Sequence, residues 1–105
     1  MSLDVHIGTD ATSASKELPR FSLTELEHVL IFTKCNINNN ELLCRIKDYY
    51  SDSIYTINEI PSLLSELQGN IPKCNDNNTI KVLVTLIEIC KEAQNDNKNL
   101  YFFAD

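Results

Sequence analysis

The alternation of apolar and polar residues near the start of the chain predicts a β-strand. Residues 3–8 read LDVHIG, in which every second residue is large and apolar. This is the period of a strand that buries one face and exposes the other. Small and polar residues follow over 9–19, where we expect a loop.

A capping box predicts the start of the first helix. In SLTE (22–25) the Ser22 hydroxyl can accept from the amide of Glu25, whose carboxylate can reach back to the amide of Ser22. We expect this helix to end at Cys35 or Asn36. Its expected buried face comprises Leu26, Val29, Leu30 and Thr33. Ile31 and Phe32 lie off this face and form either a second layer of core, which we favour, or an apolar contact patch.

Three further segments have the apolar spacing of helices. Residues 41–50, ELLCRIKDYY, follow a possible cap at Asn39 or Asn40. The side that this segment would bury comprises Leu42, Leu43, Ile46, Tyr49 and Tyr50. Residues 61–69 have proline at the start and glycine just past the end, as helices prefer. Residues 79–94 are apolar over most of the helix circumference, so we expect this helix to be enclosed at the centre of the domain.

The last apolar run, LYFF (100–103), predicts a strand that is covered on both faces, or on one face with a shielded edge. The strand over 3–8 is its strongest candidate neighbour, and IYTI (54–57) is a candidate third strand. We therefore predict an α+β fold with a small sheet of two to three strands, the N- and C-terminal strands paired, packed with about four helices. Residues 1–105 are enough for a single compact domain.

The charge of the chain restricts its partners. The formal net charge is −6 and the sequence pI is about 4.8. An acidic domain repels nucleic acid and anionic membranes and attracts basic proteins. The nine basic residues are scattered, whereas a nucleic-acid site needs a basic stripe. We therefore expect neither a nucleic-acid partner nor a membrane partner.

Hydropathy and cysteine usage suggest a cytoplasmic protein. No stretch approaches the roughly 20 apolar residues of a membrane span, and the first residues lack the pattern of a signal peptide. The four cysteines, Cys35, Cys44, Cys74 and Cys90, are expected to be reduced and structural. Their spacing fits no zinc motif, so we expect no metal.

The residue types needed for catalysis are sparse. The histidines are His6 and His28, and we interpret His28 with Glu25 as an ordinary surface pair rather than a metal or proton-transfer site. No nucleophile motif such as GxSxG is present. With two glycines the chain cannot form a glycine-rich phosphate loop. We therefore expect no enzyme activity and no cofactor.

Two segments are candidates for protein recognition. DYYSD (48–52) places two tyrosines between two acids. Tyrosine is enriched in interfaces and acids attract a cationic partner, although we slightly favour Tyr49 and Tyr50 as packing residues at a helix end. The polar loop GTDATSASKE (8–17) is the second candidate. The candidate binding residues are Asp10, Glu17, Asp48, Tyr49, Tyr50 and Asp52.

Three segments resemble a known class of proteins. The opening MSLDVHIG, the middle YTINEIPSLLSEL and the closing LIEICKEAQNDNKNLYFFAD are similar to small bacterial immunity proteins of polymorphic-toxin and contact-dependent growth inhibition systems. The resemblance implies a non-catalytic cytoplasmic domain that binds one cognate toxin one-to-one. The toxin is commonly a basic nuclease, whose active site or substrate groove is blocked. The alternative is a small acidic regulatory or adaptor domain that binds another protein.

Overall fold

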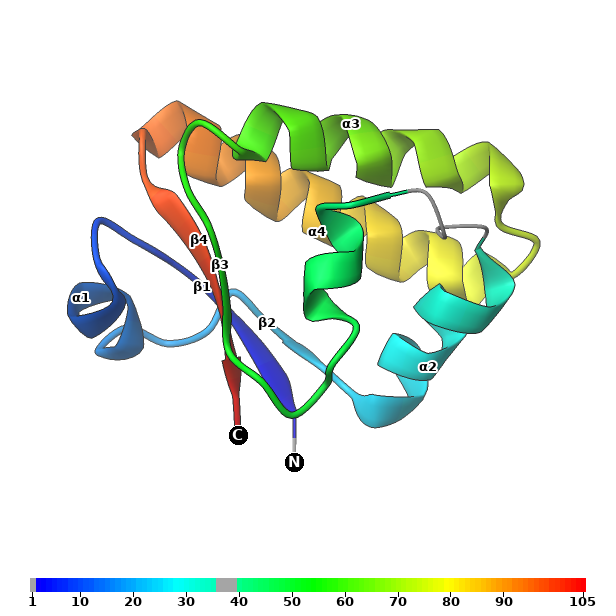
Figure 1. Ribbon diagram of the computed structural model, residues 1–105, viewed down its shortest axis with the longest axis horizontal. Helices are drawn as coiled ribbons and strands as arrows, with labels where there is room; N and C mark the ends of the chain where they lie inside the picture. Colours follow the sequence, from blue (N-terminus) through cyan, green and yellow to red (C-terminus); the bar gives the residue numbers. More distant parts are fainter. Residues whose placement is uncertain (1, 36–39) are drawn as a thin grey trace.

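The computed structural model describes residues 2–35 and 40–105, in which an antiparallel sheet has helices on both faces (Figure 1). The strands are β1 (Leu3–Gly8), β2 (Phe21–Leu23), β3 (Ser53–Tyr55) and β4 (Asn99–Ala104). Their order across the sheet is β2-β1-β4-β3. The helices are α1 (Ala11–Ser15), α2 (Glu25–Lys34), α3 (Ile60–Asn70) and α4 (Asn77–Asp96). Two short 3₁₀ helices are η1 (Leu43–Ile46) and η2 (Ile71–Lys73). The predicted α+β class is confirmed.

The N- and C-terminal strands pair, as the sequence predicts, and they form the centre of the sheet. β1 pairs with β4 from Leu3 opposite Ala104 to Gly8 opposite Asn99. The third predicted strand is also present, as β3 over 53–55 rather than over 54–57. The described residues contain a fourth strand, β2, so the expectation of two to three strands was too low. β2 was missed because it has three residues and overlaps the predicted capping box.

α4 is the central helix, as predicted, and it packs between the sheet and α3 (Figure 1). It begins earlier than expected because the carboxylate of Asp76 caps it by accepting from the amide of Thr79 at 2.9 Å. The residue that follows its last turn is Asn97, whose positive φ of 58° is typical of a helix C-terminus. α3 continues through Gly69 to Asn70, so the predicted stop at the glycine was wrong.

α2 begins later than predicted and buries a different face. Its capping box is formed by Thr24 and Glu27, because Ser22 belongs to β2. The buried residues are His28 and Ile31, whereas Leu26 is 67% exposed. The predicted buried face was therefore wrong, and the core interpretation of Ile31 is confirmed. A predicted end at Asn36 and a cap at Asn39 lie outside the described residues.

Two predictions for the connecting segments were also wrong. The loop over 9–19 contains the short helix α1, whose Ala14 is buried. The helix over 41–50 is replaced by η1, which spans four residues. Helical periodicity was misleading here because the backbone amides of Leu42 and Leu43 donate to the side chain of Glu66 on α3. Tertiary contacts therefore determine the conformation of this segment.

Candidate protein-interaction site

Acidic side chains from several elements meet at one end of the sheet. The segment between η1 and β3 lies at the same end as the start of β1 and the start of α2 (Figure 1). We call the following residues the acidic end: Asp4, Glu25, Glu27, Asp48, Tyr50 and Asp52. Their proximity is reflected in the pKa of the Tyr49 phenol, which is raised by burial and then by the negative charges of Glu25, Asp4 and Glu27.

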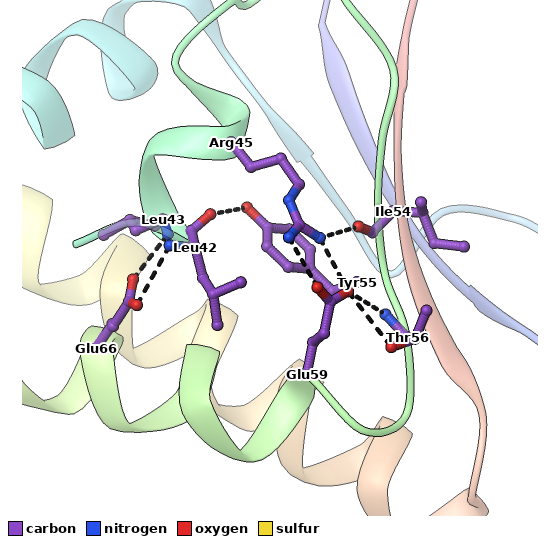
Figure 2. A network of polar contacts seen from close by, with 8 residues as sticks. All are labelled: Leu42, Leu43, Arg45, Ile54, Tyr55, Thr56, Glu59 and Glu66. Carbon is purple, nitrogen blue, oxygen red and sulfur yellow. Dashed lines mark hydrogen bonds and ion pairs between the residues drawn. The ribbon is translucent and has the colours of Figure 1, made fainter.

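A polar network attaches η1 to β3 and α3 (Figure 2). The guanidinium of Arg45 donates to both carboxylate oxygens of Glu59, at 2.9 and 2.8 Å, and to the backbone oxygen of Ile54 at 2.7 Å. It also lies 4.9 Å from the centre of the Tyr55 ring, in cation–π geometry. The hydrogen bonds from Arg45 lower the pKa of Glu59 to about 2. The ion pair is therefore intact at neutral pH.

Two further contacts hold the chain just before η1. The buried Tyr55 donates its hydroxyl to the backbone oxygen of Leu42 at 2.6 Å. The carboxylate of Glu66 accepts from the amides of Leu42 and Leu43, at 3.2 and 2.8 Å (Figure 2). These bonds from β3 and α3 fix the segment that leads to residues 47–52. The acidic end is thus presented on a rigid support.

The two predicted tyrosines have different positions. Tyr49 is 5% exposed, donates its hydroxyl to the backbone oxygen of Leu23 at 2.8 Å, and packs its ring 5.0 Å from that of His28. Tyr50 is 62% exposed and rests edge-on against Tyr49, with the ring centres 5.5 Å apart. Tyr49 is therefore a packing residue, and Tyr50 is the aromatic side chain available to a partner.

The predicted acids of this segment are fixed by local hydrogen bonds. Asp48 accepts from the Ser51 hydroxyl at 2.7 Å and from the Tyr50 amide at 3.0 Å, and these bonds lower its pKa. Asp52 accepts from the amide of Ala104 at 2.7 Å. Asp48 is thus held beside Tyr50, and Asp52 is held against the end of β4. The structure brings these predicted site residues together.

The other two candidate residues lie apart from this group, around α1. Asp10 caps α1 by accepting from the amide of Ser13 at 2.8 Å, and this bond lowers its pKa. Glu17 is exposed just after α1. In contrast, the acidic end includes Asp4, Glu25 and Glu27, which the sequence did not indicate as binding residues. Only the alternation in β1 could have indicated Asp4, because the other two are brought in by tertiary packing.

The histidines and cysteines are packing residues. The predicted surface pair of His28 with Glu25 was wrong, since His28 is buried and its Nε2 donates to the backbone oxygen of Ile46 at 2.7 Å. Cys35, Cys74 and Cys90 are buried, and burial raises the pKa of the Cys90 thiol to about 12. Within the described residues, no three or more His, Cys, Asp and Glu side chains are grouped to hold a metal ion. None of the helices described has the length and hydropathy needed to cross a membrane.

Comparisons of the chain with protein-family models, with curated proteins and with solved structures find no match. The likeness to immunity proteins therefore stays a prediction from the sequence.

Proposed function

We propose that this chain is a protein-binding domain whose acidic end contacts a cationic partner, and that the partner is a cognate bacterial toxin. The observation that carries the proposal is the acidic end itself. Five carboxylates from β1, α2 and the 47–52 segment lie at the end of the sheet where the ring of Tyr50 is exposed. Lys47 is the basic residue of that segment, so negative charge predominates there.

Charge and aromatic surface have separate roles in such binding. The carboxylates attract a basic surface over distances near the Debye length of about 8–10 Å and accelerate encounter. A partly exposed aromatic ring at the centre of the contact then slows dissociation. The rigid support from Arg45, Tyr55 and Glu66 lowers the ordering cost, because the segment is already fixed before binding.

The toxin hypothesis combines this surface with the sequence resemblance. If the toxin is a basic nuclease, the carboxylates would occupy the positions of substrate phosphates and block the active site or the substrate groove. Such inhibition needs no catalysis, cofactor or metal from this chain. It would take place in the cytoplasm, as a one-to-one complex.

Co-expression tests the proposal directly. The product of the gene immediately upstream is expressed in a sensitive host with and without this chain. We expect the chain to restore growth and to form a one-to-one complex with that product. Failure to protect against any linked toxin would overturn the toxin hypothesis.

Charge-reversal variants test the role of the acidic end. Glu25→Lys should lower the association rate by about tenfold at low salt, in the range by which electrostatic steering changes such rates. Glu88→Lys makes the same charge change at an exposed position of α4 outside the acidic end, and should have a much smaller effect. Equal effects of the two variants would show that net charge, rather than this surface, determines binding.

One observation favours the alternative, a regulatory or adaptor domain that assembles with itself. Leu26 and Val29 lie one turn apart on α2 and are 67% and 46% exposed. Neighbouring apolar side chains of this kind can form a contact between copies. Gel filtration of the isolated chain distinguishes the two: a tight homo-oligomer that Leu26→Lys dissociates would support self-assembly, and a monomer would not.

A further inference from the structure

The outer face of the sheet, opposite α3 and α4, is only partly covered. α1 packs over one end of this face (Figure 1). There the Nδ1 of His6 donates to the backbone oxygen of Ala14 at 2.9 Å. Beside α1 the face carries a mainly apolar groove of about 290 Å³. The groove is lined by Ala11, Asp52, Ser53, Ile54, Tyr101 and Phe103.

The strand register places two carboxylates on either side of one aromatic ring. Asp4 is directly opposite Phe103 in the β1–β4 pair, and alternation puts it on the face opposite the buried Leu3 and Val5. Ser53 is opposite Phe102, so Asp52 falls opposite Phe103 from the other side. The bond from the amide of Ala104 to Asp52 agrees with this position. We call Asp4, Phe103 and Asp52 the outer-face row.

The row is suited to a planar cation. Adjacent strands are about 4.8 Å apart, so both carboxylates lie within reach of a group stacked on the Phe103 ring. That ring packs against Tyr101, nearly parallel to it at 5.6 Å, and against His6 at 5.1 Å, and it remains half-buried. Asp4 accepts from the Ser2 hydroxyl and Asp52 from the amide of Ala104, each through Oδ1. The Oδ2 of each makes no hydrogen bond within the part of the chain that the structure describes.

The charge of the groove and of the outer-face row indicates which chemical group they would bind. The groove lining contains one carboxylate and no basic residue among the described side chains. A guanidinium stacks on aromatic rings and donates several hydrogen bonds in one plane, whereas an ammonium is a strongly hydrated point charge. The apolar groove beside the row can accept the methylene groups of an arginine side chain.

We propose that the outer-face row binds the guanidinium of an arginine on a basic partner protein, with the methylenes of that arginine in the groove. Asp4 and Asp52 also belong to the acidic end, so the inference rests on the proposed function for the identity of the partner. The recognition of arginine itself depends only on the geometry of this face. The partner must therefore supply one arginine side chain to this contact.

A peptide titration followed by NMR tests this proposal on the whole chain. The probe is an N-acetylated, C-amidated Gly-Arg-Gly peptide, compared with the peptide that has neutral citrulline in place of arginine. We expect the arginine peptide to shift the Ile54 methyl signals and the amide signals of residues 102–104. The citrulline peptide should shift them far less, because it has a similar shape and no charge.

Matched variants locate the site. Asp52→Asn should weaken binding of the arginine peptide by about fivefold, the upper range for an exposed ion pair. Phe103→Leu keeps an apolar side chain but removes the ring, and should also weaken binding. Glu88→Gln removes one charge from α4, outside the row, and should leave binding unchanged. Amide spectra of each free variant verify that the fold is intact.

Three results would overturn the proposal: absence of shifts on this face, equal shifts with citrulline, or equal weakening by Glu88→Gln. The outcome is separable from that of the toxin test. A chain that neutralises a toxin without binding the arginine peptide contradicts the outer-face row alone. A chain that binds arginine but protects against no linked toxin contradicts the proposed function alone.

Discussion

The packing of α1 on the sheet depends on the absence of a side chain at Gly8. A Cβ added at this position would lie 2.7 Å from the Cβ of Ala14 and 2.9 Å from both its Cα and its backbone nitrogen. Ordinary contacts between carbon atoms are about 3.5–4.0 Å. Gly8→Ala therefore requires α1 to move away from β1 by about 1 Å, because the obstructing atoms belong mainly to the backbone.

The free energy of unfolding should fall by about 1–3 kcal/mol in Gly8→Ala, the usual range for inserting a methyl group into a well-packed site. The displacement also lengthens the hydrogen bond from His6 to the backbone oxygen of Ala14, now 2.9 Å. The expected loss of unfolding free energy is a large share of the roughly 5–15 kcal/mol that stabilises a domain. The second substitution Ala14→Gly removes the closest atom, so the double variant should recover part of the loss.

The other glycine of the chain provides a matched control. Gly69 lies inside α3, and a Cβ added there meets nothing within 4 Å. Gly69→Ala should raise stability by about 0.4–1 kcal/mol, because alanine restricts the unfolded chain and favours the helix. Urea unfolding followed by circular dichroism should therefore give midpoint shifts of opposite sign, with an unchanged m-value. If Gly8→Ala unfolds at the same midpoint as the parent, the described packing of α1 is wrong.

The remaining predictions concern β4, the polar network and a buried thiol. Phe102→Ala should lower the free energy of unfolding by about 3–5 kcal/mol, because Phe102 faces the core. Phe103→Ala should lower it by about 1–2 kcal/mol, because Phe103 lies on the partly covered face. Equal losses in urea unfolding would contradict this assignment of faces. Since Arg45 lowers the pKa of Glu59 to about 2, from an ordinary value of 4.5, the pair stabilises the fold above about pH 4.5 and loses this effect as pH falls towards 2. Glu59→Gln removes the titrating carboxylate, so its Tm should fall less than that of the parent when the pH is lowered from about 6 to about 3. An identical fall in Tm would argue against the ion pair. The thiol of Cys90, buried and with its pKa raised to about 12, should react with Ellman's reagent only on unfolding; rapid labelling of the native protein would be inconsistent with the core.

The candidate site was predictable only where its residues are neighbours in the chain. Asp48, Tyr50 and Asp52 stand out in one short segment, and the structure keeps them together at the surface. Glu25 and Glu27 reach the same surface through the packing of α2, which no local pattern contains. Local composition therefore found one part of the acidic end.

The sequence by itself determined the α+β class, the pairing of the terminal strands, the enclosed helix α4 and the acidic charge. These follow from the spacing of apolar residues, since a period of two or of 3.6 is a property of adjacent residues. Only the tertiary structure decided which face of α2 is buried, which tyrosine of 49–50 is exposed, and that Asp4 and Asp52 flank Phe103. Each of these depends on partners distant in the chain, such as the backbone oxygen of Leu23 for the hydroxyl of Tyr49. Periodicity shows that a segment has two faces, but the groups that pack against it decide which face is buried.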